Sequence, residues 1–155
     1  MADNQGMRLT NAGAEMLARV MNGEKLIFTR GAFGDAIKDG QIVEPTTDEI
    51  AKLTALINER LSLPLINITP TGAYAEVEMR VQNAEVEASF MVSEVGLFAK
   101  MDGEETEQLY GYYSAGLKGD WMPQKQSAIA KDYIYTVIIC IGNADNVTAL
   151  INRSD

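Results

Sequence analysis

The sequence predicts an α+β fold in which two helices of the N-terminal half pack on a mainly antiparallel β-sheet or sandwich. The first third of the chain holds two stretches with capping residues and apolar residues at helical spacing. From residue 73 onward apolar and polar residues alternate, as strands with one buried face require. A length of 155 residues suits a single domain, residues 1–155, with a proper hydrophobic core.

The first helix is predicted over residues 11–22. Thr10 or Asn11 can cap it, and Gly23 is placed to end it. Its apolar face consists of Met16, Leu17, Val20 and Met21. A strand is predicted next, over residues 24–33, and the Gly- and Asp-rich residues 34–45 predict a loop.

The second helix is predicted to begin at Thr46. The residues Thr46-Thr47-Asp48-Glu49 fit a capping box, in which the Thr46 hydroxyl and the Glu49 carboxylate accept hydrogen bonds from free amides of the first turn. An apolar stripe at helical spacing follows, made of Ile50, Leu53, Ile57 and Leu61. Pro64 closes this region, and residues 65–69 predict a short strand.

The clearest strand signal lies at residues 73–82, where every second residue is apolar. The alternation resumes at residues 86–92 after a turn at Asn83. A further strand at 94–100, which contains Gly96, reaches a hairpin turn at Asp102-Gly103 and pairs with residues 108–114. Gly96 suggests a bulge or a close backbone approach.

The last third of the chain is less regular. Residues 115–131 have no periodicity and predict a long irregular loop, which in a compact domain is usually functional or disordered. Residues 133–141 are apolar on both faces, which predicts a strand that is central or covered at an interface. Residues 143–151 can add one more strand.

Composition narrows the function. The net charge of −9 argues against nucleic acid and against an anionic membrane surface as partners. The apolar runs are too short to span a bilayer, and residues 1–6 lack the features of a signal peptide. We therefore expect the protein to be made in a reducing cytoplasm. The one cysteine, Cys140, lies in an apolar run and predicts a buried structural thiol.

The chain offers little catalytic chemistry. It has no histidine, which removes the commonest general base and metal ligand. The carboxylates of Glu76 and Glu78 are best interpreted as the solvated face of a strand, and the acidic residues 102–107 as a solvated hairpin tip. Ser93 has no base, and residues 31–35 lack the lysine of a phosphate loop. We expect no enzyme activity, no cofactor and no bound metal.

Aromatic residues suggest a protein interface instead. Trp121 stands beside Met122 and Pro123, and Tyr112 and Tyr113 lie shortly before them. Protein interfaces enrich aromatic residues and methionine. Trp121 can equally fold over the core of its own domain, and Tyr110 and Tyr112, predicted on one strand face, suit the core as well. Because aromatic rings also stack on sugars, a carbohydrate-binding module that recognises a receptor is the alternative.

Two stretches carry a resemblance to a known family. The first runs from Leu9-Thr10-Asn11-Ala12-Gly13 through Leu26-Ile27-Phe28-Thr29-Arg30 to Gly34-Asp35. The second is Val92-Ser93-Glu94-Val95-Gly96-Leu97-Phe98, followed later by Gly142-Asn143-Ala144-Asp145. Together, over about residues 7–151, they resemble the phage tail-collar fibre family, whose N-terminal domain attaches a fibre to the baseplate or tail tip.

The resemblance implies a structural virion protein of a phage tail, made in the bacterial host. Its partners would be baseplate or tail-tip proteins and a separate tail fibre, and it would form a homo-oligomer, with a trimer expected. The N-terminal helix and residues 31–35 would help to dock the domain, which adds Phe33 and Asp35 to the interface candidates. Residues 133–141 would lie in the core. The family supplies no catalytic residues.

The chain departs from the family pattern at its end. Family members continue into a shaft and a receptor-binding tip, whereas in this sequence Ile151 is followed by four polar residues, the last of them Asp155. We expect a stand-alone adaptor to which a separate fibre binds, with an excised fibre head as the other interpretation.

Overall fold

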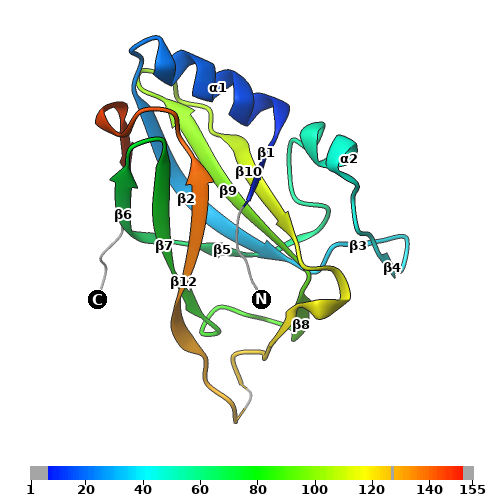
Figure 1. The fold of residues 1–155 in the computed structure, drawn as a ribbon. Coiled ribbons are helices and arrows are strands. Elements are labelled where there is room, and N and C mark those ends of the chain that lie inside the picture. The colour runs from blue at the N-terminus through cyan, green and yellow to red at the C-terminus, as the bar shows by residue number, and fades with distance from the viewer. Residues whose placement is uncertain (1–6, 127, 152–155) are drawn as a thin grey trace.

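Two β-sheets pack face to face in the computed structural model, which describes residues 7–126 and 128–151 (Figure 1). The larger sheet has six strands. Five of them follow the order β1 (Arg8–Leu9), β10 (Gln108–Ser114), β9 (Glu94–Met101), β2 (Leu26–Gly34) and β13 (Val147–Ala149), and β5 (Glu59–Leu63) pairs with the end of β2. The smaller sheet has three strands, β12 (Asp132–Cys140), β7 (Tyr74–Gln82) and β6 (Leu65–Thr71). All of these pairs are antiparallel except β13 with β2, which confirms the predicted α+β class.

The main core fills the space between the two sheets. Every second residue of β7 points inward, as the alternation predicts, and Val77 and Met79 are fully buried there. Phe28 and Tyr110 meet them from the larger sheet, with their rings edge to face and 5.1 Å apart. Glu76 lies on the opposite, exposed face of β7.

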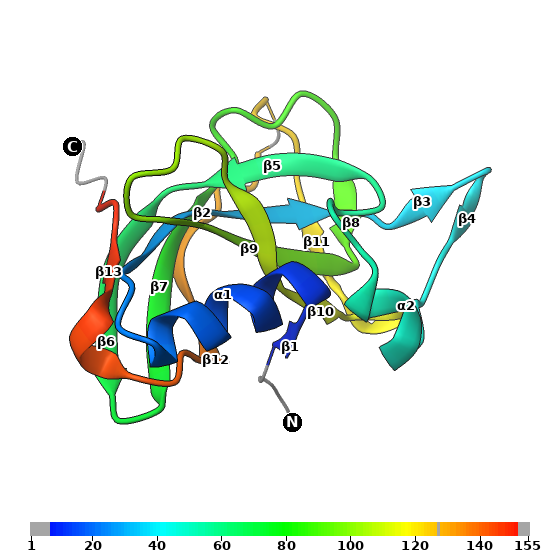
Figure 2. The ribbon, with the colours of Figure 1, turned by 90° about the horizontal axis from the view of Figure 1, so that it is seen from above.

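Helix α1 (Asn11–Met21) lies across one end of the two sheets (Figures 1 and 2). The Thr10 side chain caps it by accepting a hydrogen bond from the amide of Gly13, and Gly23 ends it with a φ of +98°. Met16 and Val20 complete the main core from this end. The predicted first helix and the strand that follows it are confirmed.

Helix α2 (Thr47–Ala51) is much shorter than predicted. Its capping box between Thr46 and Glu49 is present, but the helix ends at Ala51. The stripe of apolar residues is split, because Ile50 packs on the outer face of the larger sheet whereas Leu61 belongs to β5 (Glu59–Leu63) and to the main core. The two lie in different elements, so the prediction of one helix to Pro64 is wrong.

Two segments between the main strands differ from their predicted structure. The predicted loop at 34–45 contains the short strands β3 (Ile37–Lys38) and β4 (Gln41–Ile42), which project from the body (Figure 2). The predicted strand at 86–92 shortens to β8 (Phe90–Val92). The residues before β8 form a turn, which the Asn83 side chain ties to residues 124–131 by hydrogen bonds with the carbonyls of Gln124 and Ile129 and with the Lys131 amide.

The region predicted as an irregular loop, residues 115–131, is partly regular. It contains a 3₁₀ turn, η1 (Gly116–Lys118), and a strand, β11 (Asp120–Met122), that pairs with β8. A second 3₁₀ turn, η2 (Ala144–Asn146), leads into β13, which confirms the predicted final strand.

The last long strand differs most from expectation. β12 is an edge strand of the smaller sheet, so the central placement is wrong, and the other predicted placement, covered at an interface, stays a prediction. One face carries Val137 and Ile139 into the core, and the other leaves Ile134 and Ile138 exposed. The partly exposed Cys140 lies at the end of this strand, so it is not the fully buried thiol that the sequence predicts.

Candidate protein-binding site

The carboxylate of Glu94 connects three segments of the chain beneath the candidate site. Glu94 is fully buried at the start of β9, beside Gly34 of β2. Its Oε1 accepts hydrogen bonds from the Ile57 amide at 2.8 Å and the Tyr112 hydroxyl at 2.6 Å. Its Oε2 accepts from the amides of Ala36 at 3.1 Å and Asn58 at 2.8 Å. Four donors thus satisfy a charge that would otherwise be costly to bury.

The hydroxyl of Tyr112 depends on this arrangement. Burial, followed by the hydrogen bond to Glu94 and the negative charge of that carboxylate, raises the pKa of Tyr112 above its ordinary value. The tyrosine therefore stays protonated and remains a donor. Through the Glu94 carboxylate, the Tyr112 hydroxyl connects β10 to the segment between α2 and β5.

Asp35 forms a second buried carboxylate next to the first. It accepts hydrogen bonds from the Ile37 amide at 3.0 Å, from Nδ2 of Asn58 at 2.9 Å and from the Arg60 guanidinium at 2.7 Å. Burial alone would raise the pKa of Asp35, but these hydrogen bonds and the charge of Arg60 hold it below its ordinary value. Asp35 is therefore ionised, and it supports the turn after β2.

The structure separates the seven interface candidates from the sequence into two groups. Five of them are buried within the chain itself, namely Phe33, Asp35, Tyr112, Met122 and Pro123. Trp121 is half exposed on β11, and Tyr113 is partly buried at the end of β10. Only Trp121 and Tyr113 therefore offer side-chain surface to a partner.

Tyr110 and Tyr112 belong to the core, but not to one face. The ladder between β10 and β9 is irregular between Leu109 and Gly111, and this bulge turns Tyr110 into the main core. Tyr112 instead joins a smaller cluster with Ile50 and Phe98 on the outer face of the larger sheet. Their predicted shared face is therefore wrong.

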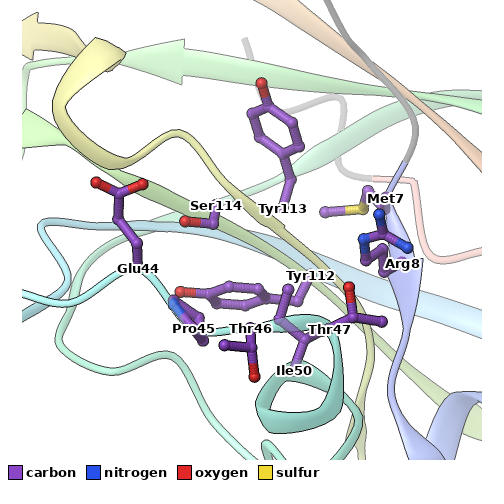
Figure 3. Close-up of a pocket in the computed structure, with 10 residues that line it drawn as sticks. All are labelled: Met7, Arg8, Glu44, Pro45, Thr46, Thr47, Ile50, Tyr112, Tyr113 and Ser114. Carbon is purple, nitrogen blue, oxygen red and sulfur yellow. The ribbon is translucent and has the colours of Figure 1, made fainter.

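A pocket of about 730 Å³ opens beside the end of β10 (Figure 3). Its lining comes from β1, from the end of β10 and from the start of α2, and comprises Met7, Arg8, Glu44, Pro45, Thr46, Thr47, Ile50, Tyr112, Tyr113 and Ser114. Arg8 and Glu44 lie at opposite sides of it in Figure 3. Neither forms an ion pair with the residues that the structure describes.

A second pocket, of about 320 Å³, lies between the two sheets at the same end of β10. We call it the tyrosine pocket, because Tyr113, Tyr133 and Tyr135 line it together with Phe33, Val92, Val95 and the residues of the turn before β11. Burial raises the pKa of Tyr135 to about 12, and the neighbouring tyrosines add to this shift. Burial and the charge of Asp120 raise the pKa of Tyr133 to about 12. The hydroxyl groups of Tyr133 and Tyr135 therefore stay protonated.

Among residues 7–126 and 128–151, no group of three His, Cys, Asp or Glu side chains is placed to hold a metal ion. The helices of that part of the chain are all too short or too polar to cross a membrane. The two pockets described above and the exposed Trp121 contain interface candidates that the sequence predicts.

Sequence reasoning missed the residues that matter most at this site. The sequence around Glu94 gives no signal that this residue is buried, because its hydrogen-bond donors come from the distant residues 36, 57, 58 and 112. Arg8 and Glu44 lie outside every motif, and only the fold brings them to one pocket. Comparison with protein-family models, curated proteins and solved structures finds no match.

Proposed function

We propose that the chain is a structural protein of a phage tail or phage-tail-like particle, which attaches a tail fibre to the baseplate or tail tip by oligomerisation and docking. The proposal rests on the sequence resemblance to tail-collar fibre proteins. Its partners are baseplate or tail-tip proteins and a separate fibre, and its place is the virion.

The observation that carries the proposal is the convergence of the resembling stretches. Gly34, at the end of the first stretch, pairs with Glu94 of the second. A Cβ built on Gly34 would lie 2.3 Å from Oε2 of Glu94, so the glycine and the carboxylate fit each other. Thr10, near the start of the first stretch, caps α1 and donates to the Leu109 carbonyl. The residues of the two resembling stretches therefore contact one another in the fold, although they are far apart in the sequence.

The exposed apolar residues agree with assembly. Trp121 is 50% exposed on β11, and Ile134 and Ile138 are 56% and 44% exposed on the outer face of the smaller sheet. Burial of such side chains between chains is favourable, at about 25 cal/mol for each Å² of apolar surface. These residues are the surface that we assign to contacts with partner subunits, whether copies of this chain in a trimer or other proteins.

The alternative function, binding of carbohydrate on a receptor, requires an exposed aromatic platform. Tyr112 is fully buried and cannot belong to one, which leaves Trp121 and Tyr113. A glycan array that gives no signal with the purified protein would remove this alternative, whereas specific binding lost in Trp121→Ala would favour it over the structural role.

The first prediction concerns Trp121→Ala. The variant is expected to fold normally, because half of the side chain is exposed, but to enter particles at less than about one tenth of the wild-type level, a loss of about 1.4 kcal/mol of interface energy. Quantitative mass spectrometry of purified particles measures this. Ile37→Ala is the matched control, since Ile37 is 41% exposed on β3, outside the surface assigned to partner contacts. Normal incorporation of the Trp121 variant would contradict the interface.

A further inference from the structure

The outer face of the smaller sheet carries an exposed row of apolar side chains. β12, β7 and β6 lie side by side (Figure 1), and alternate residues of β12 and β7 point away from the core. On β12 the outward residues Ile134 and Ile138 are 56% and 44% exposed. At about 3.3 Å per residue, these two side chains lie about 13 Å apart along the strand. We call them the apolar row.

An acidic row on β7, made of Glu76 and Glu78, runs beside the apolar row. In the register of the two strands, Glu76 lies opposite Ile138. Glu78 lies opposite Thr136, so both carboxylates share the outer face with the isoleucines. Neither carboxylate forms an ion pair with the residues that the structure describes. A partner that brings positive charge to this row is therefore attracted to it.

A second copy of this face is a poor partner for it. Packing of two such faces would bring the acidic rows of both copies together, and the whole chain already carries a net charge of −9. The cation of the same strand, Arg80, is paired with Asp132 at 3.0 Å. The charges therefore favour a different protein, which supplies lysine or arginine side chains to the acidic row.

The dimensions of the face suit a single helix. Three strands with two spacings of about 4.8 Å form a sheet about 10 Å wide, close to the diameter of one α-helix. A little more than two helical turns, at about 5.4 Å each, span the apolar row. The helices of the described chain pack elsewhere, α1 across one end of the sheets and α2 on the outer face of the larger sheet. One helix from a partner can therefore cover the apolar row and reach the acidic row.

We propose that the outer face of the smaller sheet binds a basic amphipathic helix of another protein. The helix packs its apolar side chains on Ile134 and Ile138, and it directs lysine or arginine side chains towards the acidic row. Apolar contact supplies affinity, and the carboxylates select a basic helix over an acidic one. The inference rests on the proposed function only for the identity of the partner, a fibre or baseplate protein.

Binding of labelled peptides to the full chain tests the charge preference. The first probe is a helical peptide of about 18 residues, or five turns, with leucine on one face and lysine beside the leucine. The second probe has glutamate in place of every lysine. Fluorescence anisotropy is expected to show that the lysine peptide binds about tenfold more tightly than the glutamate peptide. Equal affinity for the two peptides would overturn the proposal.

Charge reversal separates the acidic row from the overall charge of the chain. The double variant Glu76→Lys/Glu78→Lys is expected to prefer the glutamate peptide. The matched control is Asp102→Lys/Glu105→Lys, which makes the same change in net charge on the exposed turn between β9 and β10 and should keep the wild-type preference. A reversed preference in both double variants would show attraction to net charge alone and would overturn the proposal.

NMR locates the bound helix without any substitution. Titration with the lysine peptide is expected to shift the amide signals of the apolar and acidic rows more than those of the rest of the chain. The exposed Trp121 on β11 is the internal comparison. If the largest shifts fell at Trp121 or outside the smaller sheet, the helix would bind another surface and the proposal would be wrong.

Analytical ultracentrifugation tests the competing occupant, a second copy of this chain. The double variant Ile134→Asn/Ile138→Asn is expected to bind the lysine peptide about tenfold more weakly and to keep the wild-type mass in solution. A wild-type oligomer that this variant dissociates would show that copies of the chain cover the face, and would overturn the proposal. None of these experiments uses particles, so absence of the protein from the virion would contradict the proposed function and leave this inference intact.

Discussion

The Glu94 carboxylate shows how one residue can hold distant segments together. Glu94→Gln replaces one of the two acceptor oxygens with an NH₂ group, which can only donate. Each oxygen of Glu94 accepts two hydrogen bonds, so in either orientation of the glutamine side chain the NH₂ group faces two donors. We expect the variant to lose about 3 kcal/mol or more of unfolding free energy, measured by urea denaturation.

The control for this change is Glu76→Gln on the exposed face of β7, which is expected to stay within about 0.5 kcal/mol of wild type. Equal stability of Glu94→Gln and Glu76→Gln would contradict the role assigned to Glu94. Tyr112→Phe removes a single donor to the same carboxylate, so it should cost less than Glu94→Gln.

Asp35 predicts a pH dependence. Its folded pKa lies below the ordinary value of 3.8, so the folded state binds fewer protons than the unfolded state near that pH. The stabilisation from Asp35 is therefore complete above pH 3.8 and is lost as the pH falls through the folded pKa. The stability difference between wild type and Asp35→Asn should be constant from pH 7 to pH 5 and should shrink below pH 3.8.

Urea denaturation of both proteins across this range measures the difference. A gap that stays constant down to the acid unfolding of both proteins would show that the Asp35 charge contributes nothing. The buried roles of Asp35 and Glu94 could not be predicted from the sequence, because most of their partners are distant along the chain and only the Ile37 amide is close to Asp35. Those partners are up to 58 positions away, as with Ala36 and Glu94.

Among the elements, α1 combines a correct prediction with a hidden constraint. Capping by Thr10 and the stop at Gly23 are local signals, and the sequence predicts both. Gly13 is unfavourable in a helix by propensity alone. The fold explains it, because a Cβ at this position would lie 2.0 Å from the Tyr110 carbonyl oxygen.

Gly13→Ala should therefore destabilise the protein, although alanine has a helix propensity better than that of glycine by about 1 kcal/mol. We expect a loss of about 2 kcal/mol, because backbone of β10 must shift to admit the methyl group. Thermal unfolding measures it, with the exposed Ala14→Gly, expected to cost about 1 kcal/mol, for comparison. A Gly13→Ala protein more stable than wild type would show that α1 is not packed against Tyr110.

Helix α2 shows where local patterns fail. The capping box predicts its start correctly, but the helix ends at Ala51. Farther along, Glu94 binds the amides of Ile57 and Asn58, which lie in a non-helical segment. The apolar spacing of Ile50 and Leu61 reflects two clusters in different places and not one helical face. The spacing of apolar residues along the sequence cannot distinguish one helical face from two separate clusters.

At the scale of the whole molecule, the sequence predicts the class of fold because alternation in β7 and the Asp102-Gly103 hairpin are local. Strand order is not local. β12 has the composition of a central strand, yet it forms an edge and exposes Ile134 and Ile138. A strand with apolar residues on both faces is typical of a strand that is covered on both faces. In the proposed assembly, a partner subunit covers the outer face of β12.

The measurement that tests the central claim most directly is cross-linking mass spectrometry on purified particles from the source. A structural role in the tail predicts cross-links from the exposed Lys118 or Lys125 to a baseplate subunit or to a separate fibre. Absence of the protein from intact particles would contradict the proposed function.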